Sequence, residues 1–363
     1  MNRRRLNMQG ARCRVRELGI QIGDLPTGPH NGITDVRGVR VGHCTVIKGE
    51  GKSEIGKGPL RTGITAILPA PPTDIITNKI QAAAHVINGF GKSVGLMQIE
   101  ELGTIETPIL ITSTLNVGKV ADGLLDYLIM DEGLEWPSIN SVVMECNDSF
   151  LNEAWGRHLG KPEVVEAIKA VSDGPVTEGC VGAGTGMAAY GYKGGVGTSS
   201  RIITCDEESF VLGALVITNM GKKGELVFRG VPIDKNNAAD KEPPGSLIMV
   251  LATDAPLSQN QLRRVAVRAT HGLARTGTIS ADSSGDIVLA FSTTRRIPMA
   301  SEHAVFQLFE LAGNHIDAFF AAAADVIEES ILNAICMAET MTGRDGNTLH
   351  ALPLDKIKSM LRI

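Results

Sequence analysis

The sequence lacks the marks of a membrane protein, a secreted protein and a general nucleic-acid binder. No apolar run in its 363 residues reaches the roughly 18 residues that a membrane span needs. A net charge of -5 supplies no basic face for nucleic acid. No apolar segment follows the early arginines, so they do not form a secretory signal. We therefore expect no membrane and no nucleic acid as partners, a cytoplasmic location, and a solvated basic tail over residues 1–18.

The sequence also lacks the spacing of a metal site or a disulfide framework. Its six cysteines form no CxxC pair, and its eight histidines are dispersed. This pattern predicts no metal, and we expect no cofactor. The cysteines are Cys13, Cys44, Cys146, Cys180, Cys205 and Cys336.

What is present is ordinary globular composition, with 43% hydrophobic and 21% charged residues, enough for a sizeable core. Short apolar runs punctuated by turn residues predict strands that often follow one another directly, which favours antiparallel pairing in a mixed α/β fold. The expected strands lie at 36–47, 64–68, 108–113, 142–144, 200–204, 210–218, 225–230, 247–252 and 287–292. The expected helices lie at 82–102, 117–130, 150–158, 162–171, 258–273, 301–342 with a break near Gly313, and from 354.

A polar linker, Asn236–Pro244, is the one boundary in this pattern, and it ends directly before Gly245 and Ser246. A serine hydroxyl can attack the preceding carbonyl, and water can then hydrolyse the resulting ester. A permissive Gly245, prolines that cannot join a sheet, and a rigid strand downstream all favour this rearrangement. Cleavage would leave the α-amine of Ser246 as a base for its own hydroxyl. Taken alone, Gly-Ser before a strand is more typical of a common turn than of self-cleavage.

Several longer segments point further, because they occur together and in one order. They are Gly32–Ile47, Arg61–Pro69, Gly103–Gly118, Val142–Asn152, Gly182–Arg201, Gly245–Leu257 and Ser283–Thr293. In these segments the chain resembles the L-aminopeptidase D-amidase/D-esterase family, which includes the β-peptidyl aminopeptidases.

The resemblance implies a four-layer αββα sandwich of the N-terminal-nucleophile-hydrolase type. It implies self-cleavage between Gly245 and Ser246, giving chains 1–245 and 246–363 that together form one structural domain. It also implies a homotetramer of processed protomers. The expected activity is release of N-terminal amino acids from short peptides, amides or esters, through an acyl-enzyme on Ser246.

The resemblance assigns roles to two residues near the start of a predicted strand. Ser284 would bridge Ser246 and Asp286, and Asp286 would stabilise positive charge on the new amine. Because they are two residues apart, both side chains would lie on one face of a strand, with Gly285 between them. Gly285 is expected to contact the substrate. By itself, Ser-Ser-Gly-Asp is typical of a turn.

Three further residues complete the expected site. Asn219, at the end of strand 210–218, would donate its amide to the oxyanion; alone it would be a turn residue. Glu145 would bind the ammonium group of the substrate, because a buried carboxylate needs such a partner. Asn147 departs from the tyrosine of some members, which leaves the transition-state geometry and the substrate range open.

The glycine-rich stretch 179–197 does not have nucleotide-binding spacing. The spacing of Gly182, Gly184 and Gly186 does not fit the dinucleotide fingerprint. Lys193 stands before the neighbouring glycines, so the phosphate-binding motif GK[ST] is absent there. We expect close backbone packing beside the active site.

Two other functions remain open from the sequence. One is an acyltransferase on a related self-cleaving scaffold, although such relatives typically cleave before threonine. The other is a non-catalytic binding protein that never cleaves. The preference among L-α-, D- and β-aminoacyl substrates also stays open.

Overall fold

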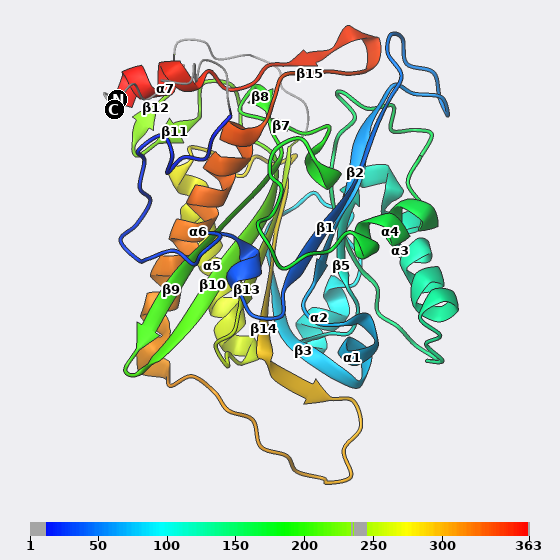
Figure 1. Cartoon of the computed structure of the whole chain (residues 1–363), viewed down its shortest axis with the longest axis vertical. Helices are drawn as coiled ribbons and strands as arrows, with labels where there is room; N and C mark the ends of the chain where they lie inside the picture. Colours follow the sequence, from blue (N-terminus) through cyan, green and yellow to red (C-terminus); the bar gives the residue numbers. More distant parts are fainter. Residues whose placement is uncertain (1–11, 234, 236–244, 362–363) are drawn as a thin grey trace, which may run out of the picture.

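The computed structural model describes residues 12–233, 235 and 245–361. Within them, two sheets pack face to face between two helical layers (Figure 1). The smaller sheet runs in the order β1 (Arg40–Lys48), β2 (Leu60–Leu68), β5 (Ile109–Ser113) and β6 (Val142–Cys146). The larger runs in the order β4 (Thr104–Ile105), β3 (Asn78–Gly89), β14 (Gly285–Pro298), β13 (Ser246–Thr253), β10 (Glu208–Asn219) and β9 (Val196–Cys205).

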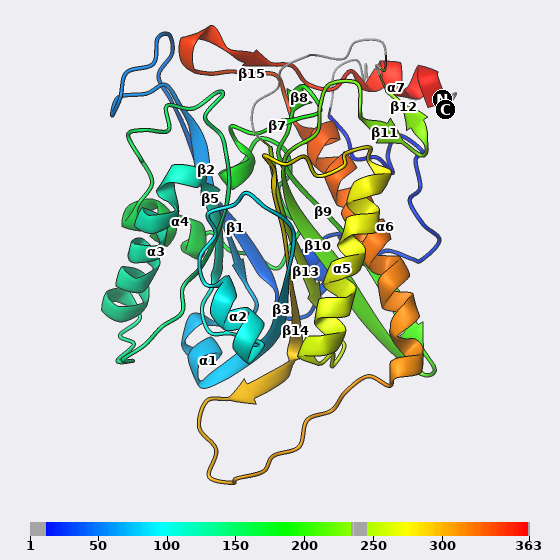
Figure 2. The ribbon, with the colours of Figure 1, turned by 180° about the vertical axis from the view of Figure 1, so that it is seen from behind.

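The helices cover the outer faces of the two sheets, as both views of the ribbon show (Figure 2). On the smaller sheet lie α3 (Val117–Asp126) and α4 (Lys161–Lys169), and on the larger lie α5 (Gln259–Arg275) and α6 (Ile316–Met337). The remaining helices are α1 (Pro72–Thr77), α2 (Leu96–Leu102) and α7 (Leu354–Leu361). The remaining strands form the pairs β7 (Ala188–Ala189) with β8 (Tyr192–Lys193), β11 (Val227–Phe228) with β12 (Val231–Pro232), and β15 (Met341–Thr342) with β16 (Thr348–Leu349).

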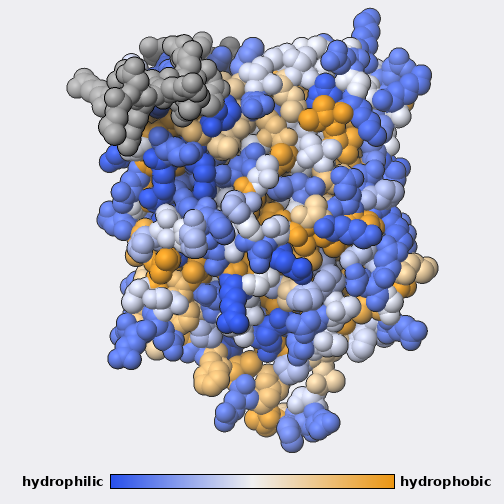
Figure 3. All heavy atoms as spheres, in the orientation of Figure 1, coloured by the Kyte–Doolittle hydropathy of each residue, from blue (hydrophilic) through white to orange (hydrophobic). Residues whose placement is uncertain are grey.

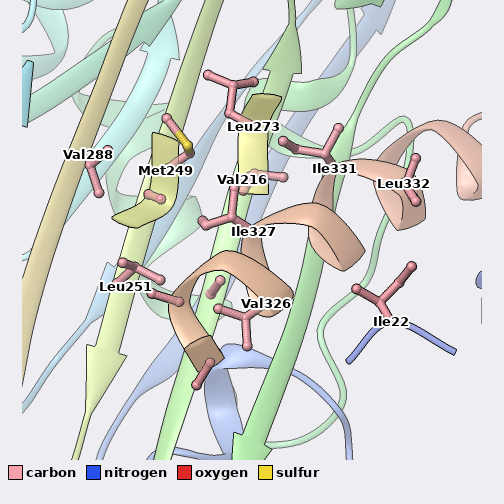
Figure 4. Close-up of a cluster of buried hydrophobic side chains, with 14 of the residues drawn as sticks. Ile22, Val216, Met249, Leu251, Leu273, Val288, Val326, Ile327, Ile331 and Leu332 are labelled. Atoms are coloured by element: carbon pink, nitrogen blue, oxygen red, sulfur yellow. The ribbon is translucent and has the colours of Figure 1, made fainter. Parts of the chain in front are cut away.

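Three hydrophobic clusters fill the three gaps between these four layers. Figure 4 shows part of the one where Val216, Met249 and Val288 of the larger sheet meet Ile327 and Ile331 of α6. A second cluster lies between the sheets, and a third lies under α3 and α4. These layers are the predicted αββα architecture.

Most sheet pairs are antiparallel, as expected, but β5 and β6 run parallel. Strands β13 and β14 also run parallel, joined by α5 as a crossover. Their first residues therefore lie at the same end of the sheet, where Ser246 pairs with Gly285. Helix α5 begins after Ser258, whose hydroxyl accepts from the backbone N–H of Gln261 at 3.5 Å, as its N-cap pattern predicts.

The helix predicted over 82–102 is wrong in its first part. That stretch contains β3, and only α2 at its end is helical. Ala82 faces the cluster between the sheets and Ala83 faces the helical side, so small side chains are buried on both faces of β3. Pairing with β14 therefore outweighs the helix propensity of the alanines.

Three other expectations need correction. Residues 150–158 form turns instead of a helix, because Asp148 accepts from the backbone of Leu151 and Asn152. The segment 225–230 contributes only β11, which pairs with β12 outside the large sheet. Within the predicted helical region 301–342 the one α-helix is α6, and residues 302–312 form an irregular segment.

This irregular segment projects from one end of the molecule, at the bottom of Figure 1. Apolar spheres gather there among polar ones in Figure 3. Its exposed apolar side chains are Val305, Phe306, Leu308 and Phe309.

The predicted solvated tail is wrong for residues 12–18. Val15 is fully buried, Arg14 pairs with Glu178 at 2.8 Å, and Arg16 pairs with Glu329 at 2.8 Å. Residues 1–11 and the predicted linker Asn236–Pro244 lie outside the described residues. In the part of the chain that is described, no helix is long and apolar enough to cross a membrane.

Candidate active site

Three strand ends meet around Ser246. Ser246 is the first residue of β13 and is 3% exposed. It pairs with Asn219, the last residue of β10, and with Gly285, the first residue of β14. The nucleophile predicted from the sequence therefore lies between two other predicted site residues, on the central strands of the larger sheet.

Two N–H donors converge on the hydroxyl oxygen of Ser246. The backbone N–H of Asn147 donates at 3.3 Å and Nδ2 of Asn219 donates at 3.4 Å. Oδ1 of Asn219 accepts from the backbone N–H of Ala188 at 3.0 Å, which turns the amide so that its NH₂ faces Ser246. Ala188 lies within the glycine-rich stretch 179–197, so this stretch packs beside the site as predicted.

The side chain of Asn147 is engaged within its own segment. Its Oδ1 accepts from the backbone N–H of Ser149 at 2.9 Å and closes a local turn. The contact of Asn147 with Ser246 is made by the backbone alone. Sequence reasoning missed this donor, because it considered only side chains at this position.

The bond between Gly245 and Ser246 lies in a tight environment. The carbonyl of Gly245 accepts from the backbone N–H of Gly285 at 3.3 Å, a contact that polarises the carbonyl. A Cβ added to Gly245 would lie 3.2 Å from Oγ of Ser284 and 3.2 Å from the carbonyl oxygen of Asn219. Gly245 thus leaves room for both neighbours.

Ser284 and Asp286 form the expected pair. Oγ of Ser284 donates to Oδ1 of Asp286 at 2.7 Å, and both residues are buried. Burial raises the pKa of Asp286, while hydrogen bonds from Ser284 and the backbone of Leu247 act in the opposite direction. Ser284 is therefore hydrogen-bonded to Asp286, and the Oγ of Ser284 lies beside Gly245. The predicted bridge from Ser284 to Ser246 is not among the hydrogen bonds of the described residues.

Glu145 lies near the end of β6, in the opposite sheet, and is 3% exposed. Its Oε1 accepts from the backbone N–H of Lys92 at 2.9 Å, and its Oε2 accepts from the hydroxyl of Thr114. The ammonium of Lys92 instead binds the carbonyl of Phe90 at 3.0 Å and lies 4.0 Å from the Phe90 ring centroid. Among the described residues, no cation forms an ion pair with Glu145.

The segment Phe90–Lys92 connects the surroundings of Glu145 with those of Ser246. A Cβ on Gly91 would lie 3.8 Å from Oε1 of Glu145, and a Cβ on Gly285 would lie 3.0 Å from the carbonyl oxygen of Phe90. Sequence reasoning missed this segment, because it was assigned to a helix. The Gly-Phe-Gly run at its start was the available signal of a strand end.

Three buried ionisable groups lie in the segments that carry or adjoin the site residues. Burial raises the pKa of the Cys146 thiol, which is hydrogen-bonded to Ser246. Burial raises the pKa of Asp148 to about 7, against the hydrogen bond that Nδ2 of Asn152 donates to its Oδ1 at 3.1 Å. Burial lowers the pKa of Lys193 to about 8, and its Nζ donates to the carbonyls of Gly184 and Gly194 at 3.0 and 2.7 Å.

The arrangement provides an oxygen nucleophile, N–H donors beside it and a buried carboxylate free to bind a cation. This set suits acyl transfer from a substrate that carries an ammonium group. In the described ranges, no group of three or more His, Cys, Asp or Glu side chains is placed to hold a metal ion.

Comparisons with known proteins agree with this chemistry. The model of peptidase family S58 matches residues 31–349. The β-peptidyl aminopeptidase BapA of Sphingosinicella microcystinivorans is 36% identical over 369 residues, covering 96% of this chain and 92% of that protein.

Solved structures match over nearly the whole chain. The PH0078 protein of Pyrococcus horikoshii OT3 is 47% identical with a TM-score of 0.91, covering 96% of this chain and 99% of that one. The L-aminopeptidase D-Ala-esterase/amidase of Ochrobactrum anthropi is 37% identical with a TM-score of 0.88, covering 96% and 98%. That enzyme is described as a prototype for the serine aminopeptidases and a new variant of the Ntn hydrolase fold, which confirms the predicted fold class. Together, the family match and these identities show that the chain belongs to peptidase family S58, whose members are aminopeptidase hydrolases.

Proposed function

We propose that the protein is a self-processing aminopeptidase or amidase in which Ser246 becomes the N-terminal nucleophile. One observation carries the proposal: Oγ of Ser246 is bound by two N–H donors, while the carbonyl of the preceding Gly245 is held by Gly285. The hydroxyl and the bond that it would cleave are thus fixed by the same sheet. The names of the relatives, a β-peptidyl aminopeptidase and an L-aminopeptidase D-Ala-esterase/amidase, support the same activity.

Processing would begin with attack of Oγ of Ser246 on the carbonyl carbon of Gly245. The hydroxyl proton passes to the departing nitrogen of Ser246, and an ester replaces the peptide bond. Water then hydrolyses the ester, leaving a carboxylate on Gly245 and a free amine on Ser246. The N–H of Gly285 is placed to stabilise the negative charge that develops on the Gly245 oxygen.

In the mature enzyme, the amine of Ser246 would take the hydroxyl proton as Oγ attacks the substrate carbonyl. Nδ2 of Asn219 and the backbone N–H of Asn147 already donate to Oγ of Ser246. A small movement would bring both donors to the oxyanion that forms on the attacked carbonyl. The amine then returns the proton to the leaving nitrogen, and water releases the acyl group from the enzyme. Asp286, reached through Ser284, would stabilise the amine while it is positive.

Glu145 would define the enzyme as an aminopeptidase. Its carboxylate is buried and accepts two hydrogen bonds, but among the described residues it has no cation partner. A buried carboxylate of this kind is stabilised by an ammonium group of the substrate. Substrates are therefore short peptides, amides or esters with a free amino end, and L-α-, D- and β-aminoacyl groups all fit this requirement.

Mass spectrometry and N-terminal sequencing of the purified protein test the proposal. We expect fragments 1–245 and 246–363, the second with 363 − 245 = 118 residues and the N-terminal sequence Ser-Leu-Ile-Met-Val. Ser246→Ala should remain one chain without activity, and Ser246→Cys should cleave slowly, because a thiol can make the same acyl shift. Ser209→Ala, at the exposed far end of β10, is the matched control and should process normally.

An intact chain with full activity would contradict self-processing, and an intact chain without activity would favour a binding protein. Adding amine acceptors during turnover separates hydrolysis from acyl transfer. We also propose a cytoplasmic location and a homotetramer of processed protomers. Light scattering of the cleaved protein tests the tetramer.

A further inference from the structure

A small cavity adjoins the Gly245–Ser246 bond on the Gly245 side. Its volume is about 90 Å³, and Gly245 and Ser284 form part of its wall. The rest comes from two segments: the turn after β10, with Lys222 and Glu225, and the connection from α5 to β14, with Ile279. The cavity therefore lies between the proposed catalytic machinery and the surface.

Proton transfer indicates which part of a substrate faces this cavity. In the proposed mechanism, the amine of Ser246 must return its proton to the leaving nitrogen, so that nitrogen must come within hydrogen-bonding reach of the amine. The amine is also the atom from which Gly245 departs when the chain is cleaved. The leaving group of a substrate therefore approaches from the side on which Gly245 and the cavity lie.

The aminoacyl part has a different place. Its ammonium group would bind Glu145, which comes from β6 in the opposite sheet and is held by Lys92 and Thr114. None of these residues lines the cavity. A substrate bound at Glu145 and attacked at Oγ of Ser246 thus has its leaving group free to extend toward the cavity.

The described residues that line the cavity include one cation, Lys222. The neighbouring carboxylate of Glu225 accepts from the backbone N–H of Lys222 at 2.8 Å and so closes the turn. The ammonium of Lys222 forms no ion pair within the described part of the chain. Ile279 adds an apolar surface that is 84% exposed. A flexible cation and an exposed apolar side chain at the same cavity suit a small amine that carries a carboxylate.

We propose that this cavity is the leaving-group subsite of the mature enzyme, and that Lys222 binds the carboxylate of the amino acid or short peptide that is released. The inference rests on the proposed function. It adds a substrate preference: among substrates with one aminoacyl group, those whose leaving group ends in a free carboxylate are cleaved best. The protein then acts chiefly on dipeptides and other short peptides with an unblocked C-terminus.

The test compares one aminoacyl group attached to glycine and to glycinamide, which differ only in the terminal carboxylate. Wild-type protein shown by mass spectrometry to be cleaved should prefer the glycine substrate, and rising salt should weaken that preference. Lys222→Ala should lower kcat/KM for the glycine substrate by about two- to fivefold, the range typical of an exposed ion pair, mainly through KM. The glycinamide substrate should be unaffected.

Two further variants and a control sharpen the result. Lys222→Arg should retain the preference, because the charge remains, and Lys222→Glu should reverse it. Lys52→Ala, an exposed lysine in the connection between β1 and β2, should behave as wild type on both substrates. A wild-type enzyme without preference, or equal losses on both substrates in Lys222→Ala, would overturn the subsite. An aminoacyl p-nitroanilide keeps the two proposals apart: if cleaved wild-type protein hydrolyses it, the proposed function stands whatever Lys222 does.

Discussion

Asn219 and Ser246 face each other across the ladder of β10 and β13, the last residue of one strand against the first of the next. Nδ2 of Asn219 lies 3.4 Å from Oγ of Ser246, and Oδ1 is held by the N–H of Ala188 at 3.0 Å. Both residues are buried on central strands, so neither can move without breaking sheet pairing. A donor fixed in this way stabilises an oxyanion without reorganising during the reaction.

Removing this donor should slow catalysis strongly. We expect Asn219→Ala to lower kcat by about a hundred- to a thousandfold, the usual cost of one oxyanion donor. Steady-state kinetics of fully cleaved protein on an aminoacyl p-nitroanilide measure it. Asn147→Ala is the matched comparison: its side chain bonds Ser149, and its backbone N–H survives the substitution, so its loss should be far smaller. Equal losses in the two variants would contradict the assignment of Asn219.

The sequence predicted the strands that carry Asn219 and Ser246, because their apolar runs end in recognisable turn residues. It did not predict the donors that hold Glu145. Lys92 lies 53 positions from Glu145 and follows β3 of the larger sheet, so its contact depends on how the two sheets pack. Thr114 lies 31 positions from Glu145, and its contact depends on the pairing of β5 with β6. The alanine-rich β3 was also missed, because its burial on both faces exists only within the assembled sandwich. The family resemblance over several segments thus pointed to Ser246 as the nucleophile, while the contacts around it depend on tertiary pairing.

The second prediction concerns the charge of Glu145. Glu145→Gln keeps the size of the side chain and can still accept from Lys92, but it loses the charge that would bind an ammonium group. We expect kcat/KM to fall by about tenfold or more on free-amine substrates, in the range of a buried charge pair that loses one partner. N-acetylated substrates, already poor with the wild-type enzyme, should change little. Equal losses on free and blocked substrates would show that Glu145 only supports the fold.

The third prediction concerns stability and the buried carboxyl of Asp148. Burial raises its pKa to about 7, above the ordinary value of 3.8. Between pH 4 and pH 7 the folded state therefore holds a proton that the unfolded state has lost. This contribution to the free energy of unfolding falls as pH rises through that window, and it is flat above it.

Asp148→Asn removes this dependence. Asn152 donates to Oδ1 of Asp148 at 3.1 Å, and an amide oxygen can accept the same bond. Relative to wild type, the variant should gain about 1–3 kcal/mol between pH 5 and pH 8.5, measured by urea unfolding at both values. Asp122→Asn, at an exposed position of α3, is the control and should show no such trend. The contrary result is a free energy of unfolding of Asp148→Asn that differs from that of wild type by the same amount at both pH values. That result would show that Asp148 is already ionised at pH 5.

The last prediction concerns Asp286 and the amine that Ser246 would gain in the proposed cleavage. Oγ of Ser284 donates to Asp286 at 2.7 Å, and burial raises the pKa of the Asp286 carboxyl. A buried carboxylate is most stable beside a positive charge, so Asp286 and the protonated amine should stabilise each other. A nearby opposite charge typically moves a pKa by about one to three units. Removing Asp286 should therefore lower the pKa of the amine.

The acidic limb of the pH profile of kcat/KM reports this base in the free enzyme. In Asp286→Asn it should move to lower pH, and the plateau rate should fall, because the positive amine loses its stabilising charge during the reaction. Ser284→Ala should also lower the rate but shift the limb less, because the carboxylate remains. Both variants are expected to process slowly, so only protein shown by mass spectrometry to be cleaved enters the profile. If cleaved Asp286→Asn keeps the wild-type rate and an unmoved acidic limb, Asp286 only supports the start of β14, and the amine of Ser246 acts without it.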